Sequence, residues 1–135
     1  MLFLIVSAAA AAGIDANAVT GRWRTEVRHG TVEIARCGPS LCGKLIDSDG
    51  LKADPDLRDI HNKDEKQRGR RLMNLQILSG FAWQDGAWTG GTIYNAEDGG
   101  TYKATVTPVS GNQLKLKGCI VWPLCKTQTW NRVKE

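Results

Sequence analysis

The four cysteines of this 135-residue chain fall into two closely spaced pairs that suit disulfide formation. Cys37 is followed by Cys42, and Cys119 is followed by Cys125. Neither pair has the Cys-x-x-Cys spacing of redox motifs or the short knuckle of tetrahedral zinc sites. In an oxidising compartment, cysteines this close together normally form structural bridges. We expect two local disulfides, although the sequence also allows other pairings, such as Cys37 with Cys119.

An apolar run near the N-terminus indicates export into such a compartment. Residues 2–12 form this run, which is too short to cross a bilayer as a helix. Ala16-Asn17-Ala18 then places small residues at the two positions that a signal peptidase reads. We expect a signal peptide over residues 1–18 and one mature domain over residues 19–135, periplasmic or secreted and without a transmembrane segment. A buried N-terminal helix is the alternative, but the alanine run has no amphipathic face.

The charge of the chain limits its partners. The formal net charge is +4 at pH 7, and it rises to +5 without residues 1–18, which contain one acid, Asp15, and no base. This is below the basic footprint of nucleic-acid-binding domains, so we expect no nucleic-acid partner. A mildly basic protein does suit an anionic envelope surface.

The mature chain consists of short stretches typical of β-strands. Apolar residues recur at every second position, as at Leu114 and Leu116, and turn residues such as Asp85-Gly86 lie between the runs. Because closure removes exposed strand edges, we expect an all-β fold, a single antiparallel up-and-down barrel. A sandwich of two sheets is the alternative. The strands, about eight in number, are expected near residues 22–28, 31–37, 42–47, 73–83, 87–95, 100–107, 112–120 and 126–134.

Two residues at the ends of this barrel are expected to meet. Trp23 lies in the first strand and Arg132 in the last, and these strands are neighbours in a closed barrel. The guanidinium can then stack on the indole and close one end of the barrel.

Aromatic residues mark candidate positions for a ligand, since a barrel of about eight strands can hold one small molecule. The alternative is that they pack the core. The candidates for lining a cavity are Trp83, Trp88, Tyr94, Tyr102, Trp122 and Trp130.

Residues 48–72 interrupt the strand pattern with a long, highly charged segment. Such a loop is often functional, and this one is expected to be either a solvated loop or an arm that contacts anions over one barrel mouth. Asp54, Asp56 and Asp59 are expected to be solvated, because they lack the apolar setting of a catalytic acid. The candidate basic patch comprises Lys63, Lys66, Arg68, Arg70 and Arg71.

Motifs along nearly the whole mature chain resemble the DUF2147 family, small exported bacterial proteins of undefined function with a lipocalin-like barrel. The Gly-x-Trp answered by a late Arg also resembles the signature of lipocalins. The chain departs from the family pattern mainly in residues 48–72, where the family's Asn-Pro-Asp-Pro-like run is replaced. The matching motifs are Gly21-x-Trp23-x-Thr25, Cys37-Gly38-x-x-Leu41-Cys42-Gly43, Gly90-Gly91-x-Ile93-Tyr94, Asp98-Gly99-x-x-Tyr102, Gly118-Cys119, Cys125 and Thr129-Trp130-x-Arg132.

The sequence shows no catalytic constellation. Neither His29 nor His61 has a nucleophile placed beside it, and no Gly-x-Ser-x-Gly elbow is present. We expect a non-catalytic protein without cofactor or metal that binds a small apolar or amphipathic ligand in the bacterial envelope or periplasm. The alternative is a packed barrel that acts as a surface module at anionic envelope components.

Overall fold

The computed structural model describes residues 15–121 and 124–134, and these form nine β-strands and three short helical segments. Residues 1–14 of the expected signal peptide and Trp122 lie outside the described residues. The elements in chain order are η1 (Ala16–Val19), β1 (Gly21–Arg24), β2 (Thr31–Cys37), β3 (Ser40–Asp47), α2 (Asp49–Ala53), η2 (Glu65–Gln67), β4 (Gln76–Ser79), β5 (Ala82–Gln84), β6 (Ala87–Asn95), β7 (Gly100–Ser110), β8 (Gln113–Val121) and β9 (Leu124–Arg132).

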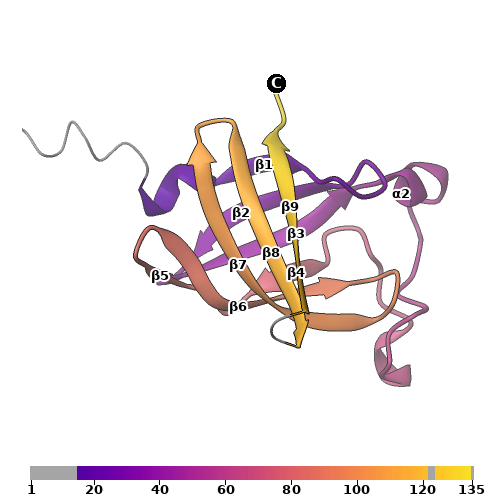
Figure 1. Ribbon diagram of the computed structural model, residues 1–135. Coiled ribbons are helices and arrows are strands. Elements are labelled where there is room, and N and C mark those ends of the chain that lie inside the picture. The colour runs from indigo at the N-terminus through magenta and orange to yellow at the C-terminus, as the bar shows by residue number, and fades with distance from the viewer. Residues whose placement is uncertain (1–14, 122–123, 135) are drawn as a thin grey trace, which may run out of the picture.

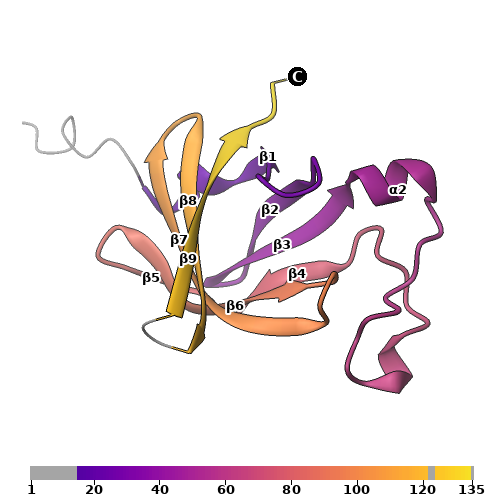
Figure 2. The same cartoon turned by 45° about the vertical axis from the view of Figure 1, so that its right-hand side comes forward.

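The strands close into the antiparallel up-and-down barrel that the sequence predicts (Figure 1). The order is β4-β3-β2-β1-β9-β8-β7-β6-β5, and a further pairing of β4 with β6 closes eight of the nine strands into a ring. The first and last strands are neighbours, with Trp23 opposite Arg132. In Figure 2, the side of the ring on which α2 and the long loop lie is turned forward by 45°.

The strand expected at residues 73–83 is divided into β4 and β5, which both pair with β6. Gly80 between them has a φ of +79°, a conformation that suits glycine and bends the strand. The ring of Phe81 turns inward over Gly91, where any side chain would collide with it. The bend therefore depends on Gly80, between β4 and β5, and on Gly91 of β6.

The core fills the end of the barrel nearest η1. Trp23, Trp88 and Leu114 are fully buried there, together with Val19 of η1. Inward-facing positions alternate with exposed lysines along β8, as the period of a β-strand requires.

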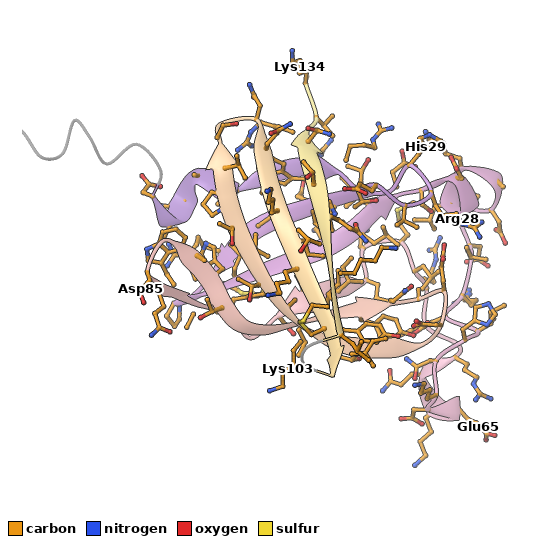
Figure 3. All side chains as sticks on the ribbon, in the orientation of Figure 1. Arg28, His29, Glu65, Asp85, Lys103 and Lys134 are labelled. Carbon is orange, nitrogen blue, oxygen red and sulfur yellow. A yellow bond between two sulfur atoms is a disulfide. The ribbon has the colours of Figure 1, made fainter. Side chains whose placement is uncertain are left out.

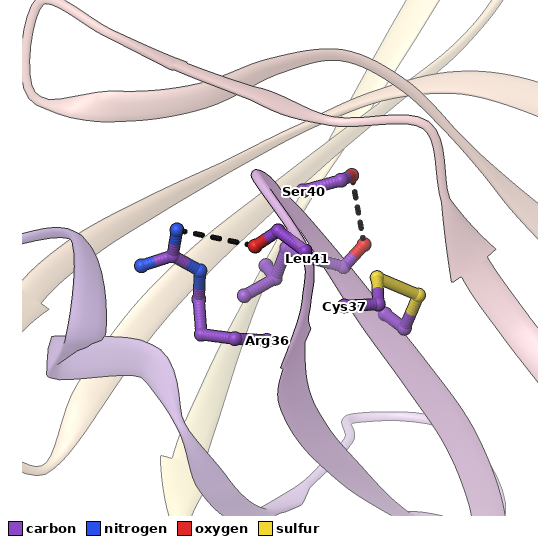
Figure 4. The surroundings of a disulfide bond; sticks show 6 residues. Arg36, Cys37, Ser40 and Leu41 are labelled. Atoms are coloured by element: carbon purple, nitrogen blue, oxygen red, sulfur yellow. Dashed lines mark hydrogen bonds between the residues drawn. A yellow bond between two sulfur atoms is a disulfide. The ribbon is translucent and has the colours of Figure 1, made fainter.

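Both disulfides join neighbours in the sequence, as expected. Cys37–Cys42 spans the β2–β3 hairpin, and Cys119–Cys125 joins β8 to β9. Figure 4 shows the first bridge beside Arg36, whose guanidinium donates to the carbonyl of Gly38. Each bridge closes a loop of only a few residues and so stabilises the fold by about 2 kcal/mol through chain entropy.

The segment 48–72 is not a solvated coil, although its charge predicts one. Ser48 caps α2 by accepting from the amide of Leu51, and Leu51 is buried. Further along, Arg58 forms a β-bridge with Arg71, and the amide of Leu72 donates to the carbonyl of Leu57. No helix of the described residues is long and apolar enough to cross a membrane.

Candidate ligand-binding site

The barrel interior opens opposite η1 into a cavity of about 860 Å³. Its polar lining groups include Arg28, His61, Asp98, Tyr102 and Lys126, which come from the loops and strand ends at the mouth. The apolar walls include Val32, Leu45, Ile77, Ile93, Leu116 and Trp130.

The inward-facing residues of strand β9 extend from the open cavity to the closed end of the barrel. Lys126, Gln128 and Trp130 occupy alternate positions and all line the cavity, with the Trp130 Nε1 donating to Gln128 Oε1 at 2.9 Å. Arg132, two positions further on, lies over the ring of Trp23. Because side chains alternate along a strand, one face of β9 runs from a charged mouth to a closed base.

The closed end is built around Arg132. Its guanidinium lies 4.3 Å from the centre of the Trp23 ring and donates to the carbonyls of Ala18, Thr20 and Gly111. The indole Nε1 of Trp23 donates to the carbonyl of Val19.

Gly21 makes room for this arrangement. It has a φ of +122°, and a Cβ there would lie 2.5 Å from Arg132 Nη1. The glycine of the Gly-x-Trp motif is therefore required sterically, because the Arg132 guanidinium occupies the space that a side chain would need.

Of the aromatic candidates, Tyr94, Tyr102 and Trp130 line the cavity, whereas Trp83 and Trp88 do not. Trp88 is fully buried at the closed end, and its Nε1 donates to the carbonyl of Ala16 at 3.0 Å. Trp83 packs edge-on against Trp88, with 5.5 Å between the ring centres. The ligand-lining assignment of these two residues is corrected, because the strands place them near η1 rather than near the mouth.

The expected cleavage would remove residues 15–18, which include most of η1 and make the contacts that attach η1 to the barrel. Ala16 and Ala18 supply the carbonyls described above, and Asn17 accepts from Arg36 at 2.9 Å. A chain starting at Val19 is therefore expected to be less stable than one starting at Asp15 by about 2 kcal/mol, since Trp88 and Arg132 lose acceptors. Urea unfolding of the two chains measures the difference. Equal midpoints would show that residues 15–18 contribute nothing to stability.

The long loop forms one wall of the cavity, and a buried carboxylate fastens it to the barrel. Asp59 is fully buried and accepts hydrogen bonds from three side chains: Tyr94 Oη at 2.6 Å, Asn62 Nδ2 at 2.9 Å and Arg70 Nε at 2.9 Å. The Arg70 guanidinium also lies 5.3 Å from the centre of the Tyr94 ring. This corrects the expectation that Asp59 is solvated, whereas Asp54 and Asp56 are exposed.

Titration follows from these contacts. Burial alone would raise the pKa of Asp59, but the hydrogen bonds from Tyr94, Asn62 and Arg70 bring that pKa below its ordinary value. Burial, together with the hydrogen bond to Asp59, raises the pKa of Tyr94 to about 12. At neutral pH the pair is therefore a carboxylate and a neutral phenol, which suits a fixed anchor.

At the mouth, ionic contacts join separate segments. Arg28 pairs with Glu97 at 2.9 Å and links the β1–β2 loop to the β6–β7 turn. His29 lies 3.0 Å from Asp49 of α2. Tyr102 donates to Asp98, and this hydrogen bond lowers the pKa of Asp98.

The arginines of the candidate basic patch are used inside the loop. Arg68 Nε donates to the carbonyl of Asn62 at 2.7 Å, Arg70 binds Asp59, and Arg71 pairs with Asp56 at 3.2 Å. Lys63 and Lys66 are exposed. The arginines thus stabilise the loop fold, and their arrangement gives no support to an anion-binding surface at this place.

The sequence assigned no role to the loop residues that form the wall. Leu57, Ile60 and Leu72 line the cavity, and Asn62 is buried beside Asp59. The apolar character of the two leucines and the isoleucine was the one signal in the sequence for a wall, but these residues have no regular spacing. Among the described residues, no group of three or more histidine, cysteine, aspartate or glutamate side chains is placed to hold a metal ion.

Comparisons with known proteins agree with this architecture. The model of the family described as "Uncharacterized protein conserved in bacteria (DUF2147)" matches residues 21–132. A solved structure from Helicobacter pylori, protein HP1028, described as belonging to the lipocalin family, superposes with a TM-score of 0.77 at 23% sequence identity. The match covers 87% of this chain and 84% of that protein. No curated protein matches the chain.

Proposed function

The chain belongs to the DUF2147 family of bacterial proteins, and from its barrel we propose that it is an exported, non-catalytic carrier of one small apolar or amphipathic molecule. The observation that carries the proposal is the cavity of about 860 Å³, whose walls are apolar and whose polar groups gather at the mouth. Binding sites for small molecules commonly have this size and this distribution of polarity. The lipocalin-like fold is compatible with the same role.

Export is part of the proposal, and the two disulfides support it. Both bridges are structural links between adjacent strands, and the described cysteines include no free thiol. Such bridges persist in oxidising compartments such as the periplasm.

A non-catalytic role fits the environment of the polar groups near the cavity. Asp59, Asp98 and Glu97 are each engaged by a neighbouring side chain. The lowered pKa of Asp59 and Asp98 keeps both ionised at neutral pH, whereas a general acid needs a raised pKa.

Gly118 provides a direct test of occupancy. It lines the cavity, and a Cβ there would meet only Ile93 Cγ2 at 3.8 Å and the carbonyl of Lys103 at 4.0 Å. The Gly118→Leu variant is therefore expected to fold and to fill the space that a ligand needs. Affinity for anilinonaphthalene sulfonate, an amphipathic fluorophore with apolar rings and one sulfonate, should fall about tenfold or more.

Gly111→Leu is the matched control, because Gly111 lies in the β7–β8 turn with open space around its Cβ position. This variant should bind the fluorophore as the parent chain does. Native mass spectrometry of the chain purified from its bacterial host provides a second readout, in which the parent retains an apolar molecule and the Gly118→Leu variant does not. Equal fluorophore binding by both variants would contradict a ligand site in the barrel.

A further inference from the structure

The most exposed large apolar side chains of the described residues lie at one end of the β8–β9 hairpin. Ile120 is 74% exposed and Leu124 is 66% exposed. Each is adjacent in sequence to a bridged cysteine, Cys119 or Cys125. The disulfide therefore fixes the strand ends from which these side chains project.

Other exposed apolar residues gather around the same opening. Val27, which is 42% exposed, and Ile60, which is 60% exposed, line the cavity mouth together with Ile120. Val27 and Ile60 come from two separate loops, and Ile120 comes from the end of β8. Val109 lies apart, near the β7–β8 turn at the opposite end of the strand. Single exposed apolar residues are ordinary, but a group around one opening marks an interaction surface.

The β8–β9 hairpin itself carries lysines and no acidic residue, and Glu26 of the β1–β2 loop contacts it at the Thr129 amide. The sequence from Gly99 to Lys134 contains no aspartate or glutamate. Lys103 pairs in register with Cys119, Lys126 pairs with Gly118, and Lys117 is two positions before Cys119. All three lysines are exposed, and none forms an ion pair with a carboxylate of the described residues. Figure 1 shows this end of the hairpin projecting from the barrel, and Figure 3 labels Lys103 beside it.

We propose that the mouth of the barrel docks on a bilayer that contains anionic phospholipid, with Ile120 and Leu124 entering the interface and the lysines facing the phosphates. Exposed apolar side chains on a hairpin that carries lysines and no acids complement such a surface in both hydrophobicity and charge. The carboxylates at the mouth, Glu97 and Asp98, are engaged by Arg28 and Tyr102. This surface is distinct from the arginines of residues 68–71, which are engaged within the loop. Docking does not require a ligand, but it would turn the cavity mouth toward the membrane.

Co-sedimentation with vesicles tests the proposal. The measurement uses the chain from Asp15, because that piece carries every contact described above and lacks the apolar run 2–12, which would bind vesicles by itself. On vesicles of equal parts phosphatidylglycerol and phosphatidylcholine, Ile120→Ser with Leu124→Ser should lower the partition coefficient about tenfold or more. Lys103→Gln and Lys117→Gln should each lower it about fivefold, and about 0.5 M salt should remove the lysine effect.

The control variants make the same kinds of substitution at positions away from the proposed docking surface. Val109→Ser removes an exposed apolar side chain, and Lys134→Gln removes a charge at the opposite end of the molecule from Lys103 (Figure 3). Both should leave partitioning within about twofold of the parent. No binding to anionic vesicles, equal losses from the control and test variants, or binding that responds to the lysines but not to Ile120 and Leu124 would each overturn the proposal. Near-ultraviolet circular dichroism and intact disulfides verify folding.

Discussion

Replacing Arg132 by methionine is expected to lower the free energy of unfolding by about 3–4 kcal/mol. The guanidinium donates to three carbonyls from two segments, those of Ala18 and Thr20 at η1 and that of Gly111 in the β7–β8 turn, and it stacks on Trp23. Methionine retains apolar contact with the indole but leaves all three carbonyls without this donor. Hydrogen bonds from charged groups contribute about 1.5–3 kcal/mol each and are not additive within one site, which sets the estimate. Urea unfolding followed by tryptophan fluorescence measures the loss.

Arg36→Met is the matched control for this change. The Arg36 guanidinium also lies over a tryptophan, 5.1 Å from the centre of the Trp88 ring, but it is exposed and donates to Asn17 and Gly38 at the surface. Its loss should be about 1 kcal/mol or less. Arg132→Lys should recover less than half of the methionine loss, because a single ammonium cannot reach three carbonyls in the planar arrangement of a guanidinium. Similar losses for Arg36→Met and Arg132→Met would contradict a special role for the closed end.

Replacing Asp59 by asparagine is expected to destabilise the protein by about 2–3 kcal/mol at neutral pH and to loosen the loop wall of the cavity. Asp59 is fully buried, and its carboxylate accepts from Tyr94, Asn62 and Arg70. An amide oxygen accepts fewer hydrogen bonds, and the Arg70 cation loses its partner. The estimate is kept below that of a fully buried ion pair because Arg70 is 37% exposed. Amide hydrogen exchange should increase mainly in residues 54–72.

The pH dependence separates an ionic anchor from simple packing. The pKa of Asp59 is lower in the folded protein than its ordinary value of 3.8. A depressed folded pKa stabilises the protein above the unfolded pKa, and this contribution disappears as the pH falls through the folded pKa. The difference in unfolding free energy between the parent and Asp59→Asn should therefore be full at pH 7 and shrink below about pH 4.

Asp56→Asn provides the control for both readouts. Asp56 is 63% exposed and contacts Arg58 and Arg71 at the surface, so its replacement should change stability by about 0.5 kcal/mol or less. A difference for Asp59→Asn that stays constant from pH 7 to pH 3, or that equals the Asp56→Asn effect, would contradict the ionic anchor.

The Arg132 and Asp59 variants act at opposite ends of the barrel. Arg132 closes the base, and Asp59 fixes the loop that supplies Leu57, Ile60 and Leu72 to the wall. Loss of the Asp59 anchor should therefore loosen the loop wall of the cavity before it destabilises the sheet. Loss of Arg132 should destabilise both the cavity and the sheet.

The sequence by itself predicted most of the strands, their up-and-down order and two local disulfides, and the structure decided against a two-sheet sandwich and against other cysteine pairings. The alternation at Leu114 and Leu116, turns such as Asp85-Gly86 and the close cysteine pairs are local features, and hairpin pairing depends on neighbours in the chain. The observed barrel differs from this expectation at Gly80, where one expected strand bends into β4 and β5, and in the first strand, which ends at Arg24 rather than near residue 28.

Only the tertiary structure decided which aromatic residues face the cavity and how the charged loop folds. Trp88 and Tyr94 lie on the same strand, yet the first packs against η1 and the second borders the cavity. Asp59 is buried because Arg70 and Tyr94, 11 and 35 positions away, approach it in the folded chain. A charge can be buried only where partners approach it, and the partners here are distant in sequence. No local pattern of residues predicts such long-range contacts.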